Sequence, residues 1–155
     1  IMNIAIAGAT GAVGHELIKL LIQRNFPVNK VKLLASARSA GKKMQFGQQM
    51  IEVEELTHDS FSDVDVAFFS CGGDRSKEFA PSAAKAGAIV IDNSSAFRMD
   101  KDVPLIVPEV NPEDLKSDSK IIANPNCSTI QMVVALKPLH DLSPIKRVIV
   151  STYQA

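Results

Sequence analysis

The stretch that decides the fold is Asn3-Ile-Ala-Ile-Ala-Gly-Ala-Thr-Gly-Ala-Val-Gly14, in which an apolar run leads straight into three evenly spaced glycines. The apolar run, residues 3–7, is typical of a strand buried on both faces in a parallel sheet. Beyond the glycines, Leu17, Ile18 and Leu21 recur at helical spacing. In a strand–turn–helix unit of this kind, glycines let the backbone approach a pyrophosphate at the positive end of the helix. We therefore predict a dinucleotide-binding turn; the alternative is a tight turn that only packs the helix on the sheet.

The remainder of the chain continues to alternate strands with helices. Further helices are expected at about residues 74–86 and from residue 127, where Pro138 should end or kink the helix. Further strands are expected at residues 31–35, 43–56 (one or two strands, with a turn at Gly47), 64–69, 88–92, 120–123 and 145–153, with a short helical turn at 58–61. This alternation predicts an α/β fold with a Rossmann-like, doubly wound, mostly parallel sheet and helices on both faces. One dinucleotide-binding domain is expected to occupy residues 1–155.

Composition restricts the class of protein. Of the 155 residues, 46% are apolar and 22% are charged, as in a globular domain with a core of its own. Basic and acidic residues number 17 each, so neither nucleic acid nor a charged membrane surface is an expected partner. No apolar run reaches the length of a membrane span, and Cys71 and Cys127 alone make neither a disulfide framework nor a metal site. We expect a cytoplasmic protein with free thiols and no metal.

Small and polar residues follow several of the expected strands. Ser36-Ala-Arg38-Ser39 stands where an NAD-binding fold places an acidic residue for the ribose hydroxyls, so we predict NADP as the cofactor; the alternative is a solvated basic loop. Ser70-Cys71-Gly72-Gly73 would admit cofactor or substrate, with Cys71 as a wall residue. Asn93-Ser-Ser-Ala-Phe-Arg98 adds an arginine able to bind a carboxylate or phosphate, unless Arg98 forms an ordinary surface salt bridge. The carboxyl ends of parallel strands meet at one edge, so these turns should share a crevice.

A lone cysteine opens the last expected helix. Asn124 precedes a proline, which favours extended backbone, so it should close a strand. Asn126 is a suitable N-cap residue and would place Cys127 in the first helical turn. Free N–H groups and the helix dipole stabilise an anion there, so the thiol should ionise readily and attack a carbonyl. The alternative is that Cys127 is a small buried hydrophobic residue.

Five segments together resemble aspartate-semialdehyde dehydrogenase. They are Gly8–Gly14, Ala35–Lys42, Asp92–Arg98, Asn124–Thr129 and Ser151–Ala155, and the resemblance covers the whole chain in order. It implies NADPH-dependent conversion of aspartyl phosphate to aspartate semialdehyde and phosphate, on the route to lysine, methionine and threonine. Members of this family are more than twice as long, and the chain stops inside an expected strand. We therefore expect the N-terminal half of a longer enzyme that forms homodimers or homotetramers.

The resemblance also implies roles for individual residues. Cys127 matches the nucleophile that forms an acyl-thioester, Asn126 a residue that helps place the carbonyl, and Gln154 one that orients the substrate. Arg98, with Asn93 at the start of its segment, matches the site of the substrate phosphate. The expected cofactor residues are Gly8, Thr10, Gly11, Ala12 and Val13 at the pyrophosphate, Ser36, Arg38 and Ser39 at the 2′-phosphate, and Ser70, Cys71 and Gly72 at the cleft wall.

Part of the family's machinery has no counterpart in this sequence. The acid–base histidine and a second substrate arginine belong to the family's C-terminal half, and His15, His58 and His140 lie in no matching motif. We read these three as structural or surface residues. The chain alone is therefore expected to bind cofactor weakly, if at all, and not to turn over.

Three other functions are considered. N-acetyl-glutamyl-phosphate reductase shares the mechanism, but has glycine and tyrosine where this chain has Asn126 and Ser128. A short-chain dehydrogenase needs a Tyr-x-x-x-Lys pair, and no lysine follows Tyr153, the one tyrosine. A non-catalytic NADP-binding module would have no need of a reactive Cys127, so the reactivity of this thiol distinguishes the module from an enzyme.

Overall fold

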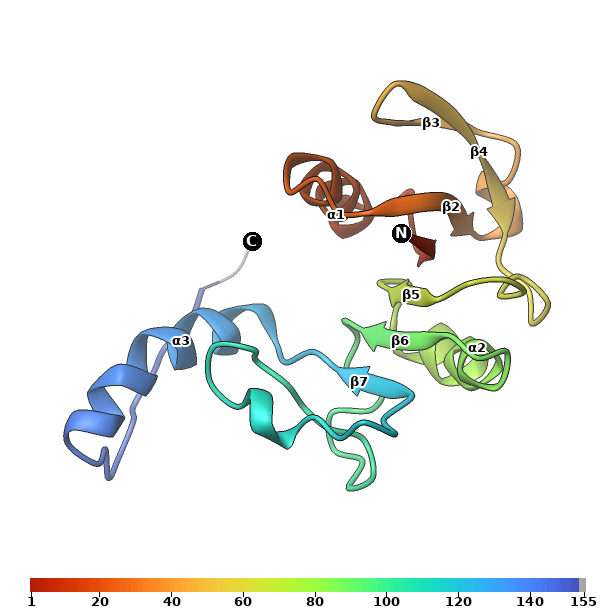
Figure 1. The fold of residues 1–155 in the computed structure, drawn as a ribbon. Coiled ribbons are helices and arrows are strands. Elements are labelled where there is room, and N and C mark those ends of the chain that lie inside the picture. The colour runs from red at the N-terminus through yellow and green to blue at the C-terminus, as the bar shows by residue number, and fades with distance from the viewer. Residues whose placement is uncertain (154–155) are drawn as a thin grey trace.

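The computed structural model describes residues 1–153, and a seven-stranded sheet forms its centre (Figure 1). The strand order is β3-β4-β2-β1-β5-β6-β7, and every neighbouring pair is parallel except the β3–β4 hairpin. The strands are β1 (Met2–Ala7), β2 (Val28–Ala35), β3 (Lys43–Phe46), β4 (Gln49–Glu55), β5 (Val66–Phe69), β6 (Ile89–Asp92) and β7 (Ile121–Ala123). The helices are α1 (Ala12–Gln23), α2 (Gly73–Lys85) and α3 (Cys127–Leu142), with 3₁₀ turns η1 (Ala37–Ser39) and η2 (Pro112–Asp114).

Helices cover both faces of the sheet. The chain moves outward from β1 to β2 through α1, and in the opposite direction from β5 to β6 through α2, so the two helices lie on opposite sides (Figure 1). Alternate residues of β1 point to opposite faces of the sheet, and each face has its own hydrophobic cluster. Ile4 and Ile6 belong to the cluster that contains Ile18 of α1, whereas Ala5 belongs to the cluster that contains Ala80 of α2. The predicted doubly wound α/β fold is confirmed.

Several boundaries differ from the sequence prediction. β2 begins at Val28 and β5 at Val66, and residues 58–61 form hydrogen-bonded turns in place of a helical turn. Pro138 was expected to end or kink the last helix; it does not end it, because α3 continues through it to Leu142. A proline removes one donor from the helix, and here the turns on either side hold without it.

The prediction of a strand at residues 145–153 is also wrong. Residues 144–153 have no regular structure, and the chain runs back along α3 (Figure 1). A strand exists only through pairing with another, and no described strand lies beside this segment. Its apolar side chains stay outside the core: Ile149 is 88% exposed and Tyr153 98%.

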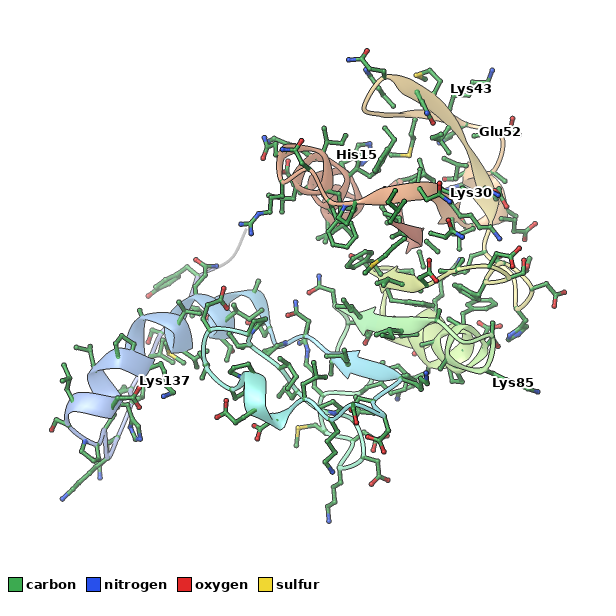
Figure 2. All side chains as sticks on the ribbon, viewed as in Figure 1. His15, Lys30, Lys43, Glu52, Lys85 and Lys137 are labelled. Atoms are coloured by element: carbon green, nitrogen blue, oxygen red, sulfur yellow. The ribbon has the colours of Figure 1, made fainter. Side chains whose placement is uncertain are left out.

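Basic and acidic residues are equal in number, 17 each. Lys30, Glu52 and Lys85 point outward from three different elements (Figure 2). Two ion pairs link side chains in residues 1–153. One joins Glu16 and Lys19 of α1, and the other joins Lys137 and Asp141 of α3. No helix among these residues is long and apolar enough to cross a bilayer.

Candidate active site

The turns that follow five strands meet along one edge of the sheet. Ala7 at the end of β1 pairs with Leu34 of β2 and with Phe69 of β5. Phe69 pairs in turn with Asp92 of β6, and Asp92 with Ala123 of β7. The sequence-predicted turns after these strands therefore lie side by side, as expected for the ligand-binding edge of a doubly wound sheet.

Gly8 makes the first of these turns possible. Its φ is +90°, and a Cβ atom there would stand 2.3 Å from the carbonyl oxygen of Ser70, in the turn after β5. Only glycine allows the two turns to pass so closely. α1 begins directly afterwards with Gly11 as N-cap, and no side chain caps it. Its first N–H groups are therefore available to an anion such as a pyrophosphate.

A hollow of 250 Å³ opens at this edge. Its lining residues are Gly8, Thr10, Gly11, Ala35, Ser36, Leu56, Ser70, Cys71 and Arg75. Six of these belong to the predicted cofactor set, so the structure brings the turns after β1, β2 and β5 to one cavity. Arg75 was missed by sequence reasoning. Its place in the first turn of α2, next to the Gly72–Gly73 turn, was a signal that it faces the same edge.

The predicted 2′-phosphate residues lie at the rim of this edge. Arg38 and Ser39 form η1 directly after β2, and Arg38 is exposed. The Ser39 N–H donates to the Ser36 carbonyl oxygen at 2.8 Å, which fixes the turn. Neither Arg38 nor Ser39 lines the hollow itself. The guanidinium is free to reach a phosphate at the open side of the crevice.

The two cysteines occupy contrasting environments. Cys71 is partly buried beneath the hollow, with its Sγ 3.9 Å from the Ser76 hydroxyl oxygen. Burial raises the pKa of the Cys71 thiol, and the nearby Asp92 carboxylate raises it further. Cys71 therefore stays protonated near neutral pH, which suits a wall residue and not a nucleophile.

Cys127, by contrast, is exposed at the first position of α3. The Asn126 side-chain oxygen accepts hydrogen bonds from the N–H groups of Ser128 at 3.1 Å and Thr129 at 3.4 Å. The predicted N-cap is thus confirmed, and the reading of Cys127 as a buried hydrophobic residue is wrong. The N–H of Cys127 itself has no partner among the described residues.

Arg98 is held by backbone carbonyls and not by a carboxylate. Its Nε donates to the Asn124 carbonyl oxygen at 2.9 Å and its Nη2 to the Asn93 carbonyl oxygen at 3.1 Å. Asn124 also donates through its side chain to Asn93 Oδ1 at 2.7 Å, tying the ends of β6 and β7 together. No ion pair forms at Arg98 within residues 1–153, so the surface salt-bridge alternative is not observed. Three of its five N–H groups remain for an anion.

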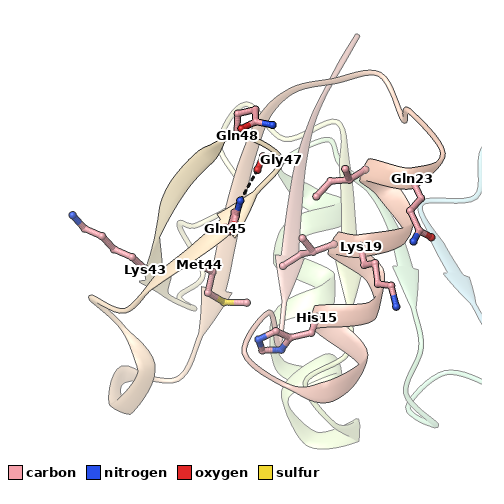
Figure 3. Close-up of a pocket in the computed structure, with 10 residues that line it drawn as sticks. His15, Lys19, Gln23, Lys43, Met44, Gln45, Gly47 and Gln48 are labelled. Atoms are coloured by element: carbon pink, nitrogen blue, oxygen red, sulfur yellow. Dashed lines mark hydrogen bonds between the residues drawn. The ribbon is translucent and has the colours of Figure 1, made fainter.

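A larger hollow lies elsewhere in the described structure. It measures 640 Å³ and runs between α1 and β3, where Figure 3 shows His15, Lys19 and Lys43 around it. His15 Nδ1 lies 2.8 Å from the Gly11 carbonyl oxygen, a local contact within α1. None of the sequence-predicted site residues lines this hollow. We place the site at the strand ends because the thiol and the arginine lie there.

Comparison with known proteins identifies the family. Residues 3–118 match the family model described as semialdehyde dehydrogenase, NAD binding domain. The chain is 61% identical to aspartate-semialdehyde dehydrogenase of Aquifex aeolicus and 54% identical to that of Bacillus subtilis, covering 99% of this chain in both cases. It covers 46% and 44% of those two proteins, so the chain spans about half the length of the curated relatives it matches.

Solved structures give the same result. The structure of aspartate semialdehyde dehydrogenase II from Vibrio cholerae complexed with ASA superimposes with a TM-score of 0.86 at 53% identity, covering 90% of this chain and 46% of that one. The Candida albicans enzyme with NADP gives a TM-score of 0.81 at 32% identity, covering 94% and 48%. The sequence match and the structural match point to the same proteins. The chain belongs to the family of semialdehyde dehydrogenase NAD-binding domains.

Proposed function

We propose that this chain is the cofactor-binding half of an NADP-dependent aspartate-semialdehyde dehydrogenase. The observation that carries the proposal is Cys127, exposed at the start of α3 and three residues after the carbonyl that holds Arg98. The proposed anion-binding arginine, in the turn after β6, is thus hydrogen-bonded to the turn after β7 that carries the proposed nucleophile. The names of the relatives support the same activity, which would serve lysine, methionine and threonine biosynthesis in the cytoplasm.

The proposed reaction begins at the Cys127 thiolate. Its Sγ attacks the acyl carbon of aspartyl phosphate, the bond from that carbon to the phosphate oxygen breaks, and phosphate leaves with the electron pair. The product is an acyl-thioester on Cys127. NADPH, when bound, supplies the hydride that reduces this thioester carbon. Cys127 then leaves as a thiolate, and the aldehyde is released.

Neighbouring residues would hold the reacting groups. Arg98, with two N–H groups fixed on backbone carbonyls, presents the remainder to the substrate phosphate, next to Asn93. Asn126 occupies the N–H groups of Ser128 and Thr129, which leaves the Cys127 amide for the developing oxyanion. Gln154 lies outside the described residues, and its substrate-orienting role stays a prediction.

The residues at the strand ends fit a dinucleotide. Gly8 puts no side chain between the first turn and the β5 turn, and the uncapped start of α1 suits the pyrophosphate beside Thr10–Val13. Ser36, Arg38 and Ser39 would take the 2′-phosphate, and Ser70, Cys71 and Gly72 would form the wall. The Candida albicans neighbour, described with NADP, supports this choice of cofactor.

We further propose that the 155-residue chain does not turn over alone, and that the longer protein is a homodimer or homotetramer. His15 and His140 contact Gly11 and Ile145, four and five residues away in sequence, and His58 contacts Ser82 of α2. None of the three projects from the turns that carry Cys127 and Arg98. A general base usually contributes about a hundredfold or more, and its absence together with that of the second substrate arginine would bring turnover below detection.

The test follows NADPH formation from aspartate semialdehyde by the longer protein that contains this sequence, with and without phosphate. We expect turnover that requires both phosphate and Cys127, and that is faster with NADP than with NAD. Turnover with N-acetyl-glutamate semialdehyde alone would identify the related reductase. Tight NADP binding without turnover would favour the non-catalytic module. Turnover by the 155-residue chain, lost on Cys127→Ala, would contradict the proposed incompleteness.

A further inference from the structure

Asp92 is a fully buried carboxylate at the last position of β6, with 0% of its surface exposed. Burying a carboxylate is costly unless hydrogen bonds compensate it. No lysine, arginine or histidine pairs with it in the described part of the chain. Its Oδ1 has no partner there, and its Oδ2 accepts a hydrogen bond from the Ser94 hydroxyl at 2.7 Å. The Ser94 hydroxyl is therefore the one hydrogen-bond partner that compensates the burial of the Asp92 side chain among the described residues.

Ser94 passes this contact on to the backbone. Its side chain is also buried, and its Oγ accepts a hydrogen bond from the Ala96 N–H at 3.0 Å. Asp92, Ser94 and Ala96 thus form a relay that fixes the first half of the turn after β6. Two successive hydrogen bonds, from Ser94 to Asp92 and from Ala96 to Ser94, thus hold this part of the turn in one conformation.

Arg98 stands at the other end of the same turn. Its two hydrogen bonds go to the carbonyl oxygens of Asn93 and Asn124, and its other side-chain N–H groups make no hydrogen bond within residues 1–153. The Asp92 carbonyl oxygen accepts the Asn124 N–H at 2.8 Å, so Asp92 also fixes the residue on which Arg98 rests. These two carbonyl oxygens can hold the guanidinium in one position only if the backbone of residues 93–98 keeps one conformation.

We propose that Asp92 and Ser94 are positioning residues that set the direction of Arg98 toward the substrate phosphate. The inference rests on the proposed function of Arg98 and assigns its orientation to the relay behind it. Both side chains are buried, so we expect them to act on the ligand through the turn and not by direct contact. Their contribution is to keep the turn in one conformation, so that Arg98 meets the phosphate without reorganisation.

The experiment compares Ser94→Ala, Ser94→Thr, Asp92→Asn and Ser95→Ala in the longer protein. Ser95 is exposed in the same turn and its side chain makes no hydrogen bond among the described residues, so Ser95→Ala is the matched control. We expect Ser94→Ala to raise the KM for phosphate about tenfold, with the KM for NADP unchanged, as for one lost charge-assisted hydrogen bond. Ser94→Thr keeps the hydroxyl and should restore most of the phosphate affinity. Asp92→Asn keeps an acceptor without a carboxylate, and its KM for phosphate should lie between those of the wild type and Ser94→Ala.

Three outcomes would overturn the inference. One is a phosphate KM in Ser94→Ala equal to that in Ser95→Ala. Another is a lower kcat in Ser94→Ala, with the KM values for phosphate and NADP raised by the same factor and a lower Tm. That pattern would indicate a merely structural role. If the wild type shows no phosphate-dependent turnover, the proposed function fails, and binding of inorganic phosphate measured by ³¹P NMR line broadening decides the inference separately. Weaker binding by Ser94→Ala supports it, and equal or absent binding in both proteins overturns it.

Discussion

The sheet and α3 differ sharply in how they are held. The strands and α1 and α2 supply the two buried clusters, in which Ile6 and Phe69 have 0% and 1% of their surfaces exposed. α3 contributes no buried residue over its sixteen positions, and Leu139 and Leu142 are 56% and 86% exposed. The edge proposed for the cofactor thus belongs to a well-packed body, whereas the proposed nucleophile stands on a helix with no fully buried side chain.

This contrast separates binding from chemistry in the molecule. The Gly8 turn and the hollow beside it derive their shape from strands with buried side chains on both faces. The position of Cys127 depends on the Asn126 cap and on the tie between the ends of β6 and β7. Changes in α3 should therefore alter the reaction more than cofactor binding, and changes in the sheet should alter the stability of the whole.

The largest expected effect is the loss of turnover in Cys127→Ala. Removing a covalent nucleophile typically lowers kcat by about 10⁴-fold or more, and we expect that loss in the longer protein. The dissociation constant of NADP, measured by fluorescence titration, should stay unchanged, since the pyrophosphate turn belongs to the sheet. A clear loss of NADP affinity would show that α3 takes part in forming the cofactor site.

Packing gives the next prediction, with Ile6→Ala and Leu142→Ala as the matched pair. Ile6 is fully buried in the α1-side cluster, so its truncation should lower the free energy of unfolding by about 2–5 kcal/mol. Leu142 is exposed, and its truncation should change that free energy by less than about 0.5 kcal/mol. Urea denaturation of the 155-residue chain measures both. Equal losses would mean that α3 packs far more tightly in solution than its exposure indicates.

The sequence predicted the sheet region much better than the region after it. Apolar runs, glycine spacing and the Asn126 cap are local signals, and each required only its own neighbours to form. The segment 145–153 has the same apolar character as a true strand, but whether it pairs depends on another strand being beside it. Pattern alone does not report the presence of that partner.

The chemistry of the site was predictable by residue type, and less so by contact. The sequence predicts that Arg98 binds an anion, and this stays a prediction; nothing in the sequence indicates that the carbonyls of Asn93 and Asn124 hold it. Hydrogen bonds between residues far apart in the chain depend on the paths of two turns at once. The same reason explains why the Asp92–Ser94 relay was not found from the sequence.

Cofactor choice supplies a smaller expected effect. Arg38→Ala removes the guanidinium at the end of β2, and the KM for NADP should rise about tenfold to a hundredfold, the value of one charged hydrogen-bonding partner. The KM for NAD should stay constant, because NAD has no 2′-phosphate to lose. Arg24→Ala, an exposed arginine at the C-terminal end of α1, is the control for loss of charge alone. Equal changes for NADP and NAD would place the 2′-phosphate elsewhere.

The smallest expected effect concerns Cys71 and the dependence of stability on pH. Burial raises the pKa of Cys71 above its ordinary value of 9.0, so above about pH 9 the unfolded chain releases this proton and the folded chain keeps it. The stabilisation is fully present below that pH and declines as pH rises through the folded-state pKa. Because the thiol is only partly buried, solvent screening should keep the slope well under about 1.4 kcal/mol per pH unit.

Denaturation between pH 8 and 11 can isolate this effect in a Cys127→Ala background, where Cys71 is the one thiol left. The Cys127→Ala, Cys71→Ala double variant lacks the titrating group and controls for the tyrosine and the lysines, which titrate over the same interval. The single variant should lose stability faster than the double variant as the pH rises. Parallel curves would mean that Cys71 ionises as easily when folded as when unfolded. The hollow above it would then be open enough to hydrate the thiolate, and the contrast with exposed Cys127 would rest on position alone.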